Sequence, residues 1–533
     1  MQGTGWWTKR LAMAVLVAGL GLASCSSGDG SDGAGRSGGS TTTSTVADDG
    51  KAEDVPAVKE HPTFTEGDCW WPRPENAPTD LTITCGTVEV PSDRSDPDTP
   101  MLHLAAVRLH RASADASAPP LVYLHGGPGG SALVGGLGGL PALDVLADHD
   151  LIAYDQRGTG LSTPSLNCPE KEEAILDALG AAGRWDDEYA ANRKAVQACY
   201  ERLSTTEGVQ LDDYDTPASV EDLESIRIAM GVDTWDVWGV SYGTRLGLAY
   251  ARTHPEPIRS LLIDSVYAPN VGGVERARSL PGGAVDRLAA ACAEQPACAS
   301  ADDDVNAELS KAEAAFDADP AELSGTFDLD GTPTTRDFVL TGPDVRAGMF
   351  AALYDSDLIP ALPGIIHGLA NGDRSILPTF ISTGVPRLTD LTEGAFYSVE
   401  CADNGPLLDP DAQAEALADP GEDGLIALGT AEAFCDVWPV EAVDPSFNEP
   451  VTADVPTLVI GGTLDPITPY PESKAQAERM PDATFMTVPG GGHGPGGDND
   501  CTRSARTAFW QDPSLPDGLP ACVAALTMPT FGT

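Results

Sequence analysis

The residue best suited to nucleophilic chemistry is Ser241, at the centre of the Gly-x-Ser-x-Gly sequence that spans 239–243. An apolar run at 235–238 precedes it, and a segment with helical spacing follows at 242–253. A serine at a sharp turn from strand to helix projects its hydroxyl clear of the sheet, and flanking glycines permit that turn. The context therefore predicts a nucleophilic serine.

A serine hydroxyl becomes a strong nucleophile only when a base takes its proton and an acid orients that base. Asp465 lies in a loop after the apolar run 457–460, and His493 lies in a Gly-rich stretch after the run 485–488. Both side chains therefore follow predicted strands, and the chain order Ser, Asp, His is that of α/β-hydrolases. We expect Ser241 to attack a carbonyl, His493 to move the proton and Asp465 to orient His493.

A second Gly-rich sequence, His-Gly-Gly-Pro-Gly-Gly at 125–130, follows another predicted strand. Acyl transfer needs two preset N–H donors for the oxyanion, one from the residue after the nucleophile and one from such a loop. We assign these donors to Tyr242 and Gly127, with Gly126 as the alternative to Gly127. We expect His125 to shape the loop rather than act as the base.

The elements that must position these groups alternate between strands and helices. Short apolar runs predict buried strands at 121–124, 151–154, 235–238, 258–263 and 457–460, and helical spacing predicts helices at 217–230 and 242–253. Runs that alternate apolar and polar residues, at 81–90 and 101–108, predict an antiparallel leading edge. The predicted fold class is α/β: an α/β-hydrolase fold with a mostly parallel sheet and helices on both faces.

The region 271–440 differs from this pattern because it is rich in Ala, Asp and Glu and has few strand-like runs. An insertion of this size is most simply a helical cap over the carboxyl ends of the strands, where ligands bind in open α/β sheets. We therefore predict a hydrolase core formed by 62–270 and 441–533, interrupted by a cap at 271–440.

The first 24 residues have the features of a secretory signal peptide: a basic start, a short apolar run and small residues before Cys25. The apolar run is shorter than the roughly 20 residues that span a bilayer. Small residues directly before a cysteine resemble a bacterial lipobox, so we expect a lipid on Cys25. The protein would then be exported and anchored on the outer face of the cell membrane, or released to the medium. Residues 25–61 are polar and begin with a run rich in Gly, Ser and Thr, which predicts a flexible tether.

The chain has 11 cysteines. With Cys25 lipid-modified, an even number remains, which in an exported protein favours disulfides. Sequence alone leaves the connectivity open, and our preferred pairing joins neighbours along the chain: Cys69–Cys85, Cys168–Cys199, Cys292–Cys298, Cys401–Cys435 and Cys501–Cys522. No spacing typical of zinc ligands occurs, so we expect no metal.

The formal net charge of −50, from 31 basic and 81 acidic residues, argues against a nucleic-acid partner. Binding to a phosphate backbone depends on Lys and Arg that neutralise phosphates. We expect a monomer whose partners are its substrates and, through the anchor, the membrane. The expected acyl transfer needs no cofactor.

Three stretches, 125–129, 155–162 and 239–243, resemble the proline iminopeptidase family of serine α/β-hydrolases. The export signal, the cysteine couples, the length and the sequence at 399–403 are more similar to its secreted actinobacterial branch, the tripeptidyl aminopeptidases. This resemblance covers roughly residues 65 to 525. It implies a serine aminopeptidase that hydrolyses peptide bonds near the free N-terminus through an acyl-enzyme.

In that family an acidic residue near the cap binds the free α-amino group of the substrate. The resemblance implies this role for Glu400 and Asp403. The alternative is that these carboxylates make only structural contacts beside a disulfide. Asp155 and Arg157, in a shared stretch, are expected to form local polar contacts that shape the floor of the site.

Two other functions remain open. One is a small-molecule esterase or amidase of the same fold, and the other is a non-catalytic lipoprotein that binds peptides. For a peptidase, the number of residues removed per cleavage depends on the depth of the cap.

Overall fold

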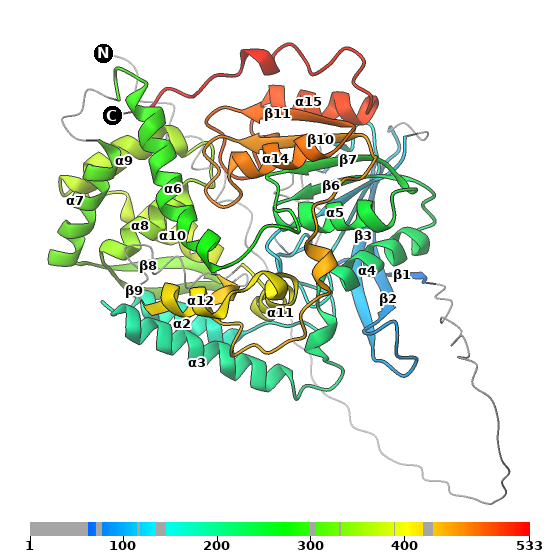
Figure 1. Cartoon of the computed structure of the whole chain (residues 1–533), viewed down its shortest axis with the longest axis horizontal. Helices are drawn as coiled ribbons and strands as arrows, with labels where there is room; N and C mark the ends of the chain where they lie inside the picture. The colour runs from blue at the N-terminus through cyan, green and yellow to red at the C-terminus, as the bar shows by residue number, and fades with distance from the viewer. Residues whose placement is uncertain are drawn as a thin grey trace, which may run out of the picture.

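The computed structural model describes residues 62–70, 77–113, 118–134, 145–298, 304–329, 332–388, 390–418 and 430–532. The expected signal peptide, the lipidation site Cys25 and the tether lie outside the described residues. Figure 1 shows a sheet flanked by helices, with a second, mainly helical region beside it.

The core is a nine-stranded sheet with the order β1-β2-β3-β5-β4-β6-β7-β10-β11. The five pairs from β5 through β11 are parallel, whereas the pairs among β1, β2, β3 and β5 are antiparallel. The predicted parallel sheet and its antiparallel leading edge are therefore confirmed. The strands are β1 (Phe64–Gly67), β2 (Leu81–Pro91), β3 (Met101–Arg111), β4 (Leu121–Leu124), β5 (Leu151–Tyr154), β6 (Trp235–Val240), β7 (Ile258–Asp264), β10 (Thr457–Gly462) and β11 (Ala483–Val488).

Helices cover both faces of the sheet, as continuous apolar strands require. Val122 and Leu124 of β4 pack in one core cluster with Leu246 of the helix after β6, whereas Tyr123 packs on the opposite face with Phe509. The helices of the core are α4 (Thr216–Ala229), α5 (Tyr242–Thr253), α14 (Tyr470–Arg479) and α15 (Asp500–Gln511).

The strand order reverses at β4, which lies between β5 and β6. Crevices for ligands open at such switch points, outside the carboxyl ends of the strands. The loop 125–130 follows β4 and Ser241 follows β6, so both lie at this edge of the sheet.

The second region is the cap, but it is not entirely helical. It contains an antiparallel hairpin, formed by β8 (Ala321–Leu329) and β9 (Thr332–Leu340), which we did not expect. Phe327 and Phe338 point to one buried face of the hairpin, as strand periodicity requires. The helices of the cap insertion are α6 (Val274–Ala293), α7 (Val305–Ala318), α8 (Gly342–Ala352), α9 (Leu362–Ala370), α10 (Leu377–Leu388), α11 (Glu393–Asn404) and α12 (Pro410–Ala418).

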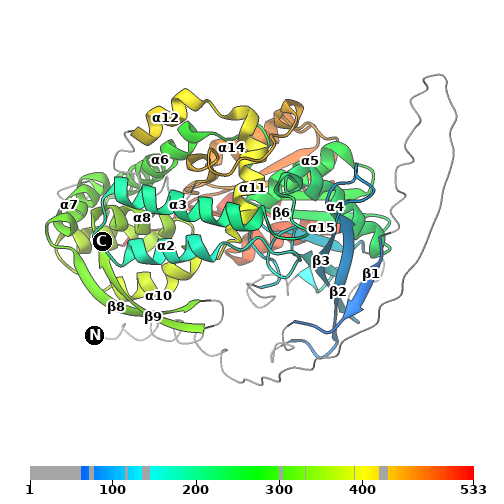
Figure 2. The same ribbon diagram turned by 90° about the horizontal axis from the view of Figure 1, so that it is seen from below.

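A further correction concerns α2 (Pro169–Leu179) and α3 (Trp185–Leu203), which we assigned to the core. These helices lie along the cap (Figure 2), and Leu176 of α2 packs against Phe327 and Phe338 of the hairpin. The cap is thus built from two insertions, one between β5 and β6 and the other between β7 and β10. Short 3-10 helices lie at Leu211–Asp213, Ile359–Ala361, Gly405–Leu407, Ala431–Ala433 (η6), Pro445–Asn448, Pro495–Gly497 (η8) and Val523–Ala525.

The ten cysteines of the folded body form five disulfides in the structure, with the pairing that we preferred from the sequence. The pairs are Cys69–Cys85, Cys168–Cys199, Cys292–Cys298, Cys401–Cys435 and Cys501–Cys522. Among the helices of the described residues, none has the length and apolar character needed to cross a membrane. In the same part of the chain, no group of His, Cys, Asp and Glu is arranged to hold a metal ion.

Candidate active site

Ser241 occupies the turn between β6 and α5 with φ 58° and ψ −126°. A non-glycine residue adopts such a backbone conformation at a cost, and functional sites are where such strain gathers. Glycines on either side make the turn possible: a Cβ on Gly239 would lie 2.3 Å from the Gly243 carbonyl oxygen, and one on Gly243 would lie 2.0 Å from that of Leu124. The sequence motif therefore has the strained turn that a nucleophilic serine needs.

Asp465 and His493 meet at the same edge of the sheet. The imidazole Nδ1 of His493 lies 3.1 and 3.0 Å from the two carboxylate oxygens of Asp465. Asp465 is fully buried, and it accepts further hydrogen bonds from the amide of Ile467 and from the amide and hydroxyl of Thr468. These bonds fix the carboxylate in the orientation that faces the imidazole.

The electrostatics of this pair suit a general base. Burial alone would raise the pKa of Asp465, but the His493 charge and several hydrogen bonds outweigh it and lower that pKa. Burial would likewise lower the pKa of His493, but the Asp465 carboxylate outweighs it and raises that pKa. The imidazolium that forms when His493 takes a proton is thereby stabilised.

The cap holds the loop that carries His493. The His493 amide donates to the carbonyl of Tyr354, whose ring meets the imidazole edge-on at 5.1 Å. The neighbouring Gly492 amide donates to the hydroxyl of Ser356. Tyr354 and Ser356 were not expected from the sequence, because they belong to no motif and lie more than a hundred residues before His493 in the chain.

The loop 125–130 lies against the nucleophile. A Cβ on Gly126 would lie 2.7 Å from the Ser241 Cβ and 3.2 Å from its Oγ, so glycine is required there. Gly127 has φ +116°, a conformation suited to glycine. His125 contacts the Gly126 carbonyl through Nδ1 at 3.2 Å, and its own carbonyl accepts from Gln156.

Asp155 and Arg157 make the local polar contacts expected of them. Asp155 accepts from the hydroxyl of Ser131 and from the amides of Leu133 and Leu161. The guanidinium of Arg157 forms two hydrogen bonds of 2.7 Å with the carboxylate of Asp222. Both side chains are buried, and these contacts fix the stretch after β5 beneath the site.

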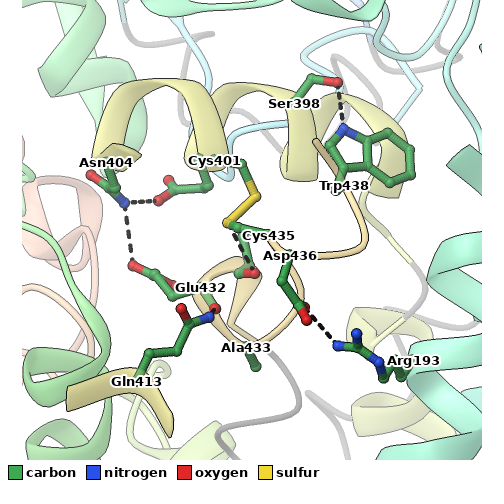
Figure 3. The surroundings of a disulfide bond; sticks show 12 residues. Arg193, Ser398, Cys401, Asn404, Gln413, Glu432, Ala433, Cys435, Asp436 and Trp438 are labelled. Carbon is green, nitrogen blue, oxygen red and sulfur yellow. Dashed lines mark hydrogen bonds and ion pairs between the residues drawn. A yellow bond between two sulfur atoms is a disulfide. The ribbon is translucent and has the colours of Figure 1, made fainter. Parts of the chain in front are cut away.

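A buried acidic pair lies on the cap side. Glu400, on α11, accepts from the hydroxyl of Tyr267 at 2.9 Å and from the side-chain amide of Asn404 at 2.6 Å. The same Asn404 amide donates to Glu432 at 3.2 Å (Figure 3). Burial raises the pKa of Glu400 to about 7, although the Arg245 charge opposes this. Two carboxylates therefore share one amide donor.

The structure separates the surroundings of Asp403 from those of Glu400. The two oxygens of Asp403 accept from the amide and hydroxyl of Thr216, and Arg245 lies 3.4 Å from one of them. The Thr216 hydroxyl also contacts the Tyr242 hydroxyl at 2.7 Å. Asp403 is thus linked through Thr216 and Arg245 to the helix that follows the nucleophile.

The disulfide Cys401–Cys435 joins α11 to the segment that contains η6 (Figure 3). Glu400 directly precedes one cysteine, and Glu432 lies three residues before the other. Glu432 was not among the residues expected from the sequence. The clue to Glu432 in the sequence was its position three residues before Cys435, the expected disulfide partner of Cys401.

Two family profiles match the chain. The profile described as "alpha/beta hydrolase fold" matches residues 119–343, and the one described as "TAP-like protein" matches residues 427–522. The chain has the α/β-hydrolase fold. These matches contain Ser241 in the first segment, and Asp465 and His493 in the second.

Several curated proteins are similar to this hydrolase. Serine protease Hip1 of Mycobacterium tuberculosis is 28% identical over 411 residues, which cover 72% of this chain and 77% of that protein. Tripeptidyl aminopeptidase of Streptomyces lividans is 32% identical over 203 residues, 35% of this chain and 36% of that protein. Carboxylesterase B of M. tuberculosis is 28% identical over 460 residues, 82% of this chain and 85% of that protein. The relatives of this hydrolase thus include proteins named as peptidases and one named as an esterase.

Proposed function

We propose that this hydrolase is an exported serine aminopeptidase that cleaves peptide bonds near a free N-terminus, as a tripeptidyl or prolyl aminopeptidase does. Ser241 attacks the scissile carbonyl while His493 accepts the hydroxyl proton and Asp465 orients the imidazole. The amides of Tyr242 and Gly127, or Gly126 in its place, donate to the oxyanion. His493 then protonates the leaving amine, and water hydrolyses the acyl-enzyme.

The observation that carries the aminopeptidase proposal is the acidic pair of Glu400 and Glu432. Burial raises the pKa of Glu400 despite the nearby charge of Arg245, and a substrate ammonium group would offer three further donors to the two carboxylates. A chain of hydrogen bonds connects Glu400 to the nucleophile turn. Tyr267, which donates to Glu400, also donates its amide to the Thr244 hydroxyl, and this hydroxyl donates to the Ser241 carbonyl.

We assign the substrate ammonium to Glu400 and Glu432 rather than to Asp403. Asp403 was a joint candidate from the sequence, but protein donors already satisfy both of its oxygens. A substrate ammonium between Glu400 and Glu432 would oppose the effect of burial and keep Glu400 ionised.

The test compares peptidyl arylamides that have a free amino group with their N-acetylated counterparts. We expect turnover of the free-amine substrates only, and a higher KM in Glu400→Gln and Glu432→Gln with kcat less affected. Equal turnover of the acetylated substrates would reject the proposal.

The similarity to carboxylesterase B favours a second candidate function, ester hydrolysis by the same triad. Simple acyl esters in the same assay separate the two. Turnover of esters without cleavage of any arylamide would favour this second candidate. If arylamides are cleaved, mass spectrometry of the products from a mixed peptide pool would give the number of residues removed per cut.

A non-catalytic peptide-binding role remains the third possibility. A fluorophosphonate probe tests it, because the probe reacts only with an activated serine. We expect labelling of the intact protein and no labelling of Ser241→Ala.

We also propose lipid anchoring at Cys25 after removal of the first 24 residues. The five disulfides support an oxidising location outside the cytoplasm. Metabolic labelling with a fatty-acid analogue should mark the protein, and Cys25→Ala should abolish the label.

A further inference from the structure

The last residue of β7, Asp264, connects two parts of the candidate triad. Its backbone carbonyl accepts from the amide of Ser241 at 3.1 Å. Its side-chain Oδ2 accepts from the amide of Gly496 at 2.8 Å, in the loop that carries His493. A Cβ on Gly496 would lie 2.4 Å from this oxygen, so glycine lets the loop approach the carboxylate.

The next residue, Ser265, lies beside Asp465, the third member of the candidate triad. It adopts φ 61°, which is a strained conformation for a serine. Its hydroxyl accepts from the amide of Gly494 at 2.8 Å, and the same side chain helps to lower the pKa of Asp465. A strained, fully buried polar residue persists only where its surroundings demand that geometry.

Asp264 is also an unusual carboxylate. It is buried, and its Oδ1 has no hydrogen-bond partner among the described residues. It lines a cleft of about 260 Å³ that His493 also lines. The other titratable groups that line this cleft are Tyr123 of β4, Asp498 beside η8 and Arg506 of α15.

We propose that Asp264 and Ser265 form a positioning pair for the catalytic base. Together they hold the His493 loop between nucleophile and acid, and Asp264 presents a second negative charge to the imidazole. Both are positioning residues, because they act through Ser241, Asp465 and His493 rather than on substrate. The inference rests on the proposed Ser–His–Asp mechanism.

Electrostatics support the same role. Burial raises the pKa of Asp264 to about 7, although the Gly496 amide and the charges of Arg506 and His493 oppose this. The carboxylate is therefore ionised above neutral pH, where a neutral imidazole acts as base. Burial lowers the pKa of His493, whereas the Asp465 carboxylate raises it. The charge of Asp264 raises this pKa further.

Two substitutions separate charge from position. Asp264→Asn keeps an oxygen for the Gly496 amide and removes the charge. Ser265→Gly accommodates φ 61° and removes the hydroxyl. We expect each to lower kcat by about 10- to 100-fold, the cost of a small misplacement of a catalytic group. Only Asp264→Asn should also move the acidic limb of the kcat/KM profile to lower pH, because a neutral imidazole is then favoured.

The control is Asp344→Asn, the same change at a carboxylate that accepts from the amide of Thr341 in the cap. It should leave kcat and the pH profile unchanged. Unchanged kcat in Ser265→Gly overturns the positioning role, and an unshifted acidic limb in Asp264→Asn overturns the charge role. If Asp264→Asn does not fold, Ser265→Gly and its kcat decide the proposal.

The rate of fluorophosphonate labelling separates this inference from the proposed function. If His493→Ala labels as fast as the parent, the proposed mechanism fails. If His493→Ala abolishes labelling while both Asp264→Asn and Ser265→Gly label at the parent rate, only the positioning inference fails.

Discussion

The disulfide Cys401–Cys435 should matter for substrate affinity as well as for stability. It closes a loop with a sequence separation of 34 residues, and the polymer model of loop closure gives a contribution of about 4 kcal/mol to the free energy of unfolding. The bond also holds the helix of Glu400 against the segment of Glu432. The double substitution Cys401→Ser with Cys435→Ser should therefore loosen the acidic pair.

The matched control removes Cys292–Cys298 instead. That disulfide lies at the end of α6, closes a loop with a sequence separation of only 6 and contains no residue of the acidic pair. The same model gives about 2 kcal/mol for it. We expect both double variants to lose stability, but only the Cys401/Cys435 variant to bind free-amine substrates more weakly.

The assay combines urea unfolding with steady-state kinetics on a free-amine arylamide. The Cys401/Cys435 variant should show a KM at least about tenfold above the parent, since the loss of one charged hydrogen bond costs about 1.5–3 kcal/mol. Its kcat should stay near the parent value, because no triad residue lies in the loop. If the folded Cys401/Cys435 variant has the same KM as the parent, the disulfide does not hold the acidic pair for substrate binding.

Three further outcomes are expected. Glu432→Gln should raise KM for free-amine peptides without changing the rate of fluorophosphonate labelling, whereas a change in labelling would place Glu432 in the chemistry. Gly126→Ala should lower kcat by about 100-fold or more, because the added methyl group would lie against Ser241. If the variant keeps the kcat of the parent, the loop 125–130 does not form the oxyanion site. The kcat/KM of the parent should fall on acidification as His493 takes a proton. Asp465→Asn should move that fall to lower pH, because removal of the carboxylate charge lowers the pKa of His493. An unchanged pH profile in Asp465→Asn would contradict the pairing of Asp465 with His493.

The fold, the turn at Ser241 and the contact between Asp465 and His493 could be predicted because their signals are local. The run at 235–238 predicted β6, which spans Trp235–Val240, and the helix expected at 242–253 has those bounds in α5. A buried parallel strand needs a continuous apolar run, and the loop after it must turn sharply. Such features are contained in about ten consecutive residues.

The errors arose where structure depends on distant contacts. The helices α2 and α3 have no local mark that assigns them to the cap. Tertiary packing places them there, because α2 packs against the β8–β9 hairpin and α3 packs against α2 and α11. The hairpin itself alternates apolar and polar residues from Leu323 to Leu329, a signal that the surrounding helical composition concealed. Glu432, Tyr354 and Ser356 reach the site through tertiary contacts alone.

The cap contributes to the catalytic geometry as well as covering the site. Arg287 of α6 donates to the backbone carbonyl of Asp465 at 2.7 Å, while Tyr354 and Ser356 bind the loop of His493. The acid and the base are thus held by residues of the same inserted region. Because Glu400 of α11 also belongs to that region, a displacement of the cap would disturb amine binding and proton transfer together. Substitutions of Arg287 and Ser356, which bind Asp465 and the His493 loop, should therefore change KM and kcat in concert, unlike those at the acidic pair, which should change KM alone.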